Sequence, residues 1–187
     1  MARRRRRDPK PLPERLAAPA LLATCVLAAG CGSASHPREP PARRLCSKTQ
    51  AAAASALRSH IRVRILSAQP SYIQCRLAGG GLVAAVEAQT SDQAWVEFDT
   101  EQSHYAQVFG PSSVHNKNEQ PQNVTGVGPQ AFWVPAQREL VTTNAQEGAT
   151  GTYVTVSVTH HRRGAGSSLG VASAVARAAL AASPPAR

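Results

Sequence analysis

The chain has 187 residues, enough for one domain with accessory segments, and its formal net charge is +10. A charge of this size is typical of nucleic-acid-binding proteins, but its distribution argues against that class. Seven basic and two acidic residues precede Cys31, whereas ten basic and eight acidic residues lie between Cys46 and Ser183. The segment expected to fold is therefore close to neutral, and we predict no nucleic-acid partner.

The first thirty residues combine a basic start with a short apolar segment. Arg3–Arg7 are followed by Leu16–Ala29, which as a helix would reach about 21 Å, less than the ~30 Å core of a bilayer. Small residues then precede Cys31, so the segment resembles a bacterial lipoprotein signal peptide. We predict cleavage after residue 30 and a lipid such as palmitate on Cys31. This places the protein at the extracytoplasmic face of the cell membrane, with secretion as the alternative.

Residues 31–45 are rich in proline and small polar side chains, a composition that disfavours packing. We interpret them as a tether to a single domain at residues 46–183, and we expect residues 184–187 to be disordered. Cys25 leaves with the signal peptide and Cys31 takes the lipid. Cys46 and Cys75 remain in an oxidising compartment, so we predict that they form a disulfide.

The first half of the domain reads as a helix followed by strands. Residues 47–50 match a capping box and predict a helix that runs to about Ser59. Strands are then predicted from alternating or continuous apolar residues, with a triple-glycine turn before the last of them. These strands are Ile61–Ile65, Tyr72–Leu77 and Leu82–Ala88.

A second helix is predicted to start at residues 90–93 and to end at Gly110-Pro111. The spacing of its four aromatic residues puts them on one helical face, and they are Trp95, Phe98, Tyr105 and Phe109. One interpretation is core packing. The other is the wall of a ligand groove between helix and sheet, extended by the long loop at residues 111–124 and by Phe132 and Trp133.

The second half of the domain adds strands and a last helix. Strands are predicted at Ala131–Val134, Glu139–Thr143 and Thr152–Thr159, the last with Val154, Val156 and Val158 facing inward. Ser168 is expected to cap a helix over Leu169–Ala182. Hairpin-length connections then predict an α+β fold, a mostly antiparallel sheet of about five to six strands flanked by two to three helices.

A set of weak motifs suggests a family. Its residues are Cys46, Cys75, Gly126, Gly128, Ala131 and Trp133, before an alanine-rich final helix. In this pattern the chain resembles the small actinobacterial secreted lipoproteins of uncharacterised function, some of which are similar to a PsbP-like sandwich. The resemblance implies a location and a fold, but it supplies no catalytic residues.

Candidate catalytic groups are isolated. Gly166-x-Ser168-x-Gly170 matches a nucleophile-elbow pattern, but no Asp, Glu or His follows it, so we interpret Ser168 as a helix cap. The adjacent His160 and His161 would point to opposite faces of a strand and could not share a metal. The acids at 97, 99 and 101 are interpreted as a solvent-exposed helix face. We predict no catalytic residue, no metal site and no cofactor.

These observations favour a membrane-anchored extracytoplasmic binding or sensing module. Its partners would be the membrane, through the lipid on Cys31, and an envelope ligand or protein. Two alternatives stay open, an envelope hydrolase with an unrecognised site and a structural or assembly partner of an envelope complex. A flat apolar surface would favour the latter.

Overall fold

The structure, a computed structural model, describes residues 39–110, 119–161 and 167–185. The predicted signal peptide, Cys31, most of the tether and positions 111–118 of the predicted loop lie outside these residues. The elements are, in chain order, α1 (Pro41–Leu57), β1 (Arg62–Ala68), β2 (Tyr72–Gly79), β3 (Leu82–Ser91), α2 (Ala94–Phe109), β4 (Gln122–Asn123), β5 (Gln130–Val134), β6 (Glu139–Thr143), β7 (Gly151–His161) and α3 (Ser168–Ala182).

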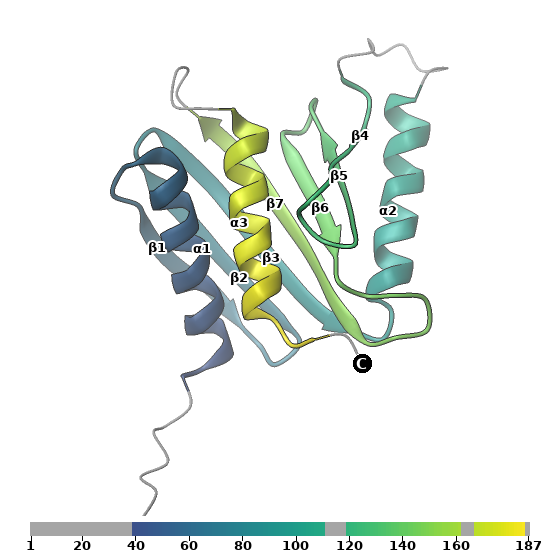
Figure 1. Cartoon of the computed structure of the whole chain (residues 1–187), viewed down its shortest axis with the longest axis horizontal. Coiled ribbons are helices and arrows are strands. Elements are labelled where there is room, and N and C mark those ends of the chain that lie inside the picture. The colour runs from purple at the N-terminus through teal and green to yellow at the C-terminus, as the bar shows by residue number, and fades with distance from the viewer. Residues whose placement is uncertain (1–38, 111–118, 162–166, 186–187) are drawn as a thin grey trace, which may run out of the picture. The chain divides into compact units, whose positions relative to one another are not determined.

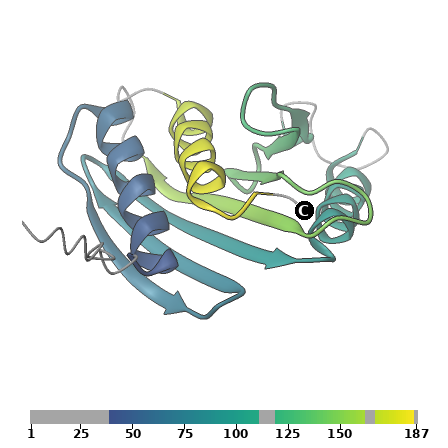
Figure 2. The same cartoon turned by 60° about the horizontal axis from the view of Figure 1, so that its bottom comes forward.

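The strands form one antiparallel sheet in the order β1-β2-β3-β7-β6-β5-β4. Helices α1 and α3 lie side by side over one face of it (Figure 1), and Figure 2 shows them as a layer above the strands. The predicted α+β class and antiparallel sheet are confirmed, and the three helices of the described residues agree with the predicted two to three. The described residues hold a 7-stranded sheet, more than the predicted five to six strands. One unpredicted strand is β4, which lies in the expected loop and pairs with β5.

Helix α1 begins at Pro41, not at the capping box predicted around Ser47. Proline suits the first helical position because its missing N–H has no partner to lose there. Leu45 and Thr49 are buried, and the Ser47 hydroxyl donates to the Arg44 carbonyl inside the helix at 3.1 Å. The end of the predicted tether is therefore helical and part of the folded domain.

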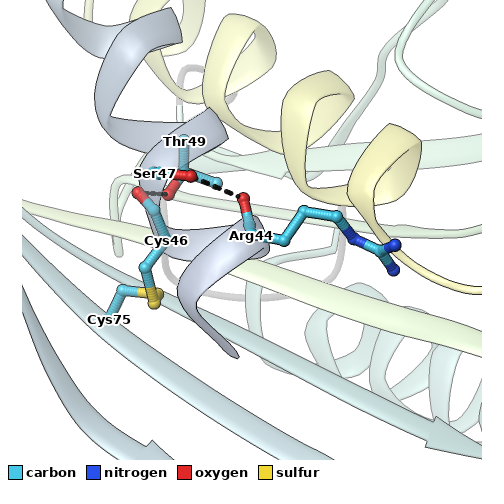
Figure 3. Close-up of a disulfide and its surroundings, with 5 residues drawn as sticks. All are labelled: Arg44, Cys46, Ser47, Thr49 and Cys75. Carbon is cyan, nitrogen blue, oxygen red and sulfur yellow. Dashed lines mark hydrogen bonds between the residues drawn. A yellow bond between two sulfur atoms is a disulfide. The ribbon is translucent and has the colours of Figure 1, made fainter. Parts of the chain in front are cut away.

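Cys46 and Cys75 form the predicted disulfide, which joins α1 to β2 (Figure 3). Both residues are buried, and their Cα atoms are 5.8 Å apart. Closing a loop of this sequence separation, 29 residues, removes unfolded-state entropy that corresponds to about 3–4 kcal/mol. The bond fixes the first helix to the sheet at the centre of the core.

Strict alternation along β3 and β7 gives the sheet two chemically different faces. The face under α1 and α3 is aliphatic, with Leu82, Ala84, Val86, Val154, Val156 and Val158 buried there. The inward orientation predicted for the three valines of β7 is confirmed. The other face carries polar side chains in register, with Glu87 opposite Thr155 and Gln89 opposite Tyr153.

The starts of α2 and α3 differ slightly from the predictions. β3 continues to Ser91, so α2 begins only at Ala94, and it ends before Gly110 as predicted. The cap of α3 is Ser167, whose Oγ accepts a hydrogen bond from the Gly170 N–H at 3.0 Å, and not Ser168. Each cap thus lies within a few residues of the sequence signal that suggested it.

Gly128 occupies the tightest contact between the β4–β5 connection and α3. A Cβ atom there would lie 2.8 Å from both Leu180 Cδ1 and Thr142 Oγ1. A larger residue would require these side chains to move, and its Cβ would also lie only 3.1 Å from the Thr143 carbonyl oxygen. In the part of the chain that the structure describes, no helix is both long and apolar enough to cross a membrane.

Candidate functional site

Helix α2 packs on the polar face of the sheet through an aromatic cluster. The Phe98 and Phe132 rings meet edge-on with centroids 5.3 Å apart, and Tyr105 contacts Phe132 at 6.0 Å. Phe109 stacks on Tyr105 at 6.1 Å. Because Phe98, Phe109 and Phe132 are buried, they form a second small core, as the packing interpretation predicted. Phe98 also lines a separate pocket of about 330 Å³ next to the β4–β5 connection.

The other two residues of the predicted aromatic surface lie outside this cluster. Trp133 points to the opposite face of the sheet from Phe132, since neighbours in a strand alternate, and it is buried in the core under α1 and α3. Trp95 is half-buried on α2. Trp133 therefore does not share a surface with Phe132 and the α2 aromatics, and the alternation of β5 is the reason.

A groove of about 540 Å³ does run between α2 and the sheet, beside the aromatic cluster. Side chains from α2, β3 and β7 line it, and the lining residues are Gln89, Val96, Glu97, Thr100, Glu101, His104 and Tyr153. Glu97 and Glu101 face it together because they are four residues apart on the helix. A groove between helix and sheet is thus present, and its lining combines two glutamates with the Tyr153 ring and a mostly apolar surface.

Two further carboxylates from the sheet lie next to this groove, each held by neighbouring donors. Glu87 accepts hydrogen bonds from Tyr72 Oη at 3.0 Å and Gln74 Nε2 at 2.8 Å. Glu139 accepts from the Tyr105 hydroxyl at 2.8 Å and the Ser157 hydroxyl at 2.6 Å. Both carboxylates therefore have fixed orientations, and they act on the groove as stationary negative charges.

The groove glutamates have raised pKa values. Burial is the main cause for Glu101, whose pKa rises to about 7, with Glu139 and Glu87 adding repulsion between like charges. Burial also raises the pKa of Glu97. The pKa of the Tyr105 hydroxyl is raised by burial and by its hydrogen bond to Glu139, so this hydroxyl stays a donor at neutral pH. Near pH 7, Glu101 therefore populates both its neutral and its ionised form.

The carboxylates around the groove lack a positive partner. In the described ranges, none of Glu87, Glu97, Glu101 and Glu139 forms an ion pair with a basic side chain. Gln89 donates to one oxygen of Glu97 at 2.7 Å, but the other oxygen, Oε2, is buried and has no hydrogen-bond partner. A buried acceptor without a donor costs free energy, which a ligand that brings an N–H group would recover.

The elbow-like segment does not assemble a catalytic triad in the described structure. Ser168 Oγ lies 3.3 Å from His161 Nδ1, a contact that the sequence analysis missed. The second ring nitrogen of His161 is buried, and it contacts no acid among the described residues. Nor do those residues contain a group of three or more His, Cys, Asp or Glu side chains placed to hold a metal ion.

Comparisons with known proteins give no assignment: no protein-family model, curated protein or solved structure matches the chain. The likeness to small actinobacterial lipoproteins therefore stays a prediction, as does a PsbP-like pattern.

Sequence reasoning found part of this site and missed part. It placed Glu97 and Glu101 on the polar side of the second helix, but interpreted them as solvated. Glu87 and Glu139 were not singled out, because nothing in a single strand shows which face a helix will cover. The one available signal was Glu87 itself, a lone acid in the predicted strand Leu82–Ala88, whose other residues are all apolar.

Proposed function

We propose that this chain is an extracytoplasmic binding module, held at the cell membrane by a lipid on Cys31, and that it binds a cationic amine. The ligand site is the groove between α2 and strands β3 and β7, which we call the acidic groove and define by Gln89, Glu97, Glu101, His104 and Tyr153. An amine would bring the positive charge that the carboxylates lack. It would also bring an N–H donor for Glu97.

The location rests on the start of the chain and on the disulfide. A basic segment, a short apolar segment and Cys31 follow one another in the order of a lipoprotein signal. The disulfide between Cys46 and Cys75 fits an oxidising compartment outside the cytoplasm. Replacing Cys31→Ala should release the protein into the medium or leave an uncleaved precursor. Unchanged membrane retention of mature-length protein would contradict the anchor.

One observation carries the ligand class, the buried Glu97 Oε2 atom with no partner inside a groove of like charges. The groove volume of about 540 Å³ suits an organic molecule better than a bare ion. Half-buried Tyr153 contributes an apolar ring at its floor, where an alkyl chain can lie. A primary amine on a short carbon chain satisfies all three features.

The two alternative functions have less support from the geometry. For a hydrolase, the strongest feature is the contact between Ser168 and His161, which lacks an acid in the described structure. For an assembly partner, the large exposed apolar residues are Ile65 and Leu66 on β1, and Val96 and Val108 on α2. The two valines are twelve positions apart, about 18 Å along a helix, so they do not form one patch.

The ligand class is tested with a diamine and its uncharged counterpart. Putrescine and 1,4-butanediol have the same carbon chain, so a difference between them reports the charge. We expect putrescine alone to shift the backbone amide resonances of Gln89, Glu101 and Tyr153 in a titration followed by NMR. Equal shifts with the diol, or none with either, would contradict the proposal.

Matched variants locate the binding site. Glu101→Gln and Glu97→Gln each remove a charge from the acidic groove and should weaken putrescine binding about fivefold at pH 8, where Glu101 is ionised. Asp99→Asn removes the same charge from the exposed side of the same helix and should change the affinity less than twofold. If all three variants weakened binding equally, the effect would be the net charge of α2 and not a site.

A further inference from the structure

A second cavity lies on the other side of the domain, where α1 begins and α3 ends. This cleft has a volume of about 810 Å³, and α1 contributes Pro41, Arg44 and Lys48 to it. Ala178 and Ala182 from α3 and Pro184 after it form the opposite wall. A smaller cavity of about 110 Å³ shares Arg44 and Pro184 with the cleft and extends toward Leu45. None of these residues belongs to the acidic groove.

The chemistry of the cleft is amphipathic. Its walls are mostly alanine and proline, whereas Arg44 and Lys48, four residues apart on α1, place two cations on the same side of the helix. Glu39 is the one acid among its lining residues, and at 3.9 Å it forms a long ion pair with Arg43, a residue that does not line the cleft. Such a composition complements a molecule with an anionic head and an apolar body.

One N–H donor of the Arg44 side chain, at Nε, lacks a hydrogen-bond acceptor. Its side chain extends away from the disulfide and toward the end of α3 (Figure 3). There its Nε atom is buried and has no hydrogen-bond partner. A guanidinium presents five N–H donors in a fork that matches phosphate oxygens. An anion in the cleft would give this buried donor its acceptor.

The length of chain between the predicted lipid anchor, Cys31, and the cleft indicates which anions the cleft can reach. Pro41 follows Cys31 by ten residues, which span at most about 36 Å when fully extended. If Cys31 carries a lipid, the cleft cannot lie farther than this from the bilayer surface. The anions present there at high density are phospholipid headgroups, whose glycerol and first methylenes are apolar enough for the alanine and proline walls.

We infer that the cleft binds the headgroup of an anionic phospholipid, with the phosphate on Arg44 and Lys48 and the lipid body against Ala178, Ala182 and Pro184. This inference rests on the proposed membrane anchor, but not on the acidic groove. The two contacts, covalent lipid and headgroup, would hold the domain with the α1 start toward the membrane. The acidic groove, on the opposite face of the sheet, then stays open to the envelope.

Vesicle binding without the anchor tests this inference. Residues 37–187 form one compact unit, so the chain from residue 31 with Cys31→Ser keeps the whole domain and cannot be lipidated. We expect it to sediment with vesicles of phosphatidylglycerol and phosphatidylcholine at 30:70, and not with phosphatidylcholine alone. Lys48→Gln and Arg44→Gln should each weaken binding about fivefold. Removing the opposing charge by Glu39→Gln should strengthen it.

Controls separate this site from general attraction and from misfolding. Arg64→Gln removes an exposed charge from β1 and should leave vesicle binding within twofold. An equal loss in this variant would overturn the inference, as would an unchanged affinity in both Lys48→Gln and Glu39→Gln, two side chains whose loss does not disturb the core. Inorganic phosphate at 10 mM should not compete. If it did, the site would take free phosphate and the lipid assignment would be wrong.

The anchor and the cleft fail in distinguishable ways. If only the anchor is wrong, the full chain with Cys31→Ala fractionates like the unchanged protein, while the vesicle assay still shows binding that depends on Lys48. If only the cleft is wrong, fractionation depends on Cys31 as proposed, while phosphatidylglycerol vesicles bind no better than phosphatidylcholine. The second result overturns the headgroup site whatever happens in the first assay.

Discussion

The two faces of the sheet are built from the same strands but differ in the chemistry of their side chains. Under α1 and α3, valine, leucine and alanine side chains pack into the larger of the two hydrophobic cores. Under α2, a small aromatic cluster supports the helix, and next to it Glu87, Glu97, Glu101 and Glu139 surround a groove. Packing on the first face stabilises the domain, whereas repulsion between like charges on the second face lowers that stability.

This difference shows which face of the sheet to examine for function. Burying carboxylates near one another costs free energy, and a fold keeps such an arrangement only where the rest of the structure compensates. Here the aliphatic core and the disulfide supply that compensation from the opposite face.

Neighbouring residues on β5 allow each face to be disrupted separately. Phe132→Ala and Trp133→Ala should each lower the free energy of unfolding by about 3–5 kcal/mol, because both side chains are buried. Their local effects should differ. Hydrogen exchange should accelerate mainly in α2 for Phe132→Ala, since Phe132 contacts Phe98 and Tyr105, and mainly in α3 for Trp133→Ala. The same protection pattern in both variants would contradict a two-sided packing.

The disulfide belongs to the stabilising face alone. Replacing both Cys46 and Cys75 by alanine should cost about 3–4 kcal/mol, measured by denaturant unfolding. A reducing agent should lower the Tm of the unchanged protein and leave that of the double variant where it is. Putrescine binding by the folded double variant should persist, because neither cysteine lies near the acidic groove. Loss of that binding would show that the two faces are not independent.

The smallest expected effect is the contribution of Glu101 to the pH dependence of the folding stability. Its pKa in the folded protein is about 7, above the 4.5 of an unperturbed glutamate, so the folded state holds its proton more tightly than the unfolded chain. Below pH 4 the group is protonated in both states and contributes nothing. Stability is lost as the pH rises to 7, and the full cost is present at pH 8. Glu101→Gln should therefore be more stable than the unchanged protein at pH 8, by less than about 1 kcal/mol since the side chain is half-exposed.

A matched control checks that this effect is local. Asp99→Asn removes a neighbouring carboxylate that is exposed on the other side of α2, so it should give no such pH-dependent gain. Chemical denaturation at pH 4, 6 and 8 compares the three proteins. A constant difference between Glu101→Gln and the unchanged protein across this range would contradict a raised pKa.

The sequence predicted most of the fold because its signals were local. Alternation in residues 152–159 placed the β7 valines, and elimination among four cysteines left Cys46 and Cys75 as the disulfide. The start of α1 was misplaced, because the pattern at Ser47 has the residues of a capping box but lies inside a helix that already began at Pro41. Proline at the first helical position was the stronger signal.

The acidic groove was only half predictable because it depends on tertiary contacts. The sequence grouped Glu97, Asp99 and Glu101 on the polar side of the second helix, and it placed the four aromatic residues on one helical face. It took the register of β3 with β7 and of β7 with β6 to bring Glu87 and Glu139 to the same place. Phe132 and Trp133 show the converse, since adjacent residues that looked like one surface are divided by the sheet.

The central claim, that the acidic groove binds an amine, is tested most directly by the protons released on binding. At pH 7 about half of the Glu101 side chains carry a proton, given a pKa of about 7, and a bound cation favours the ionised form. Calorimetric titration with putrescine in two buffers of different ionisation enthalpy should therefore report release of about half a proton. The release should disappear in Glu101→Gln and persist when the nearby His104 is replaced by glutamine. Equal heats in both buffers, or the same release from Glu101→Gln, would contradict the account.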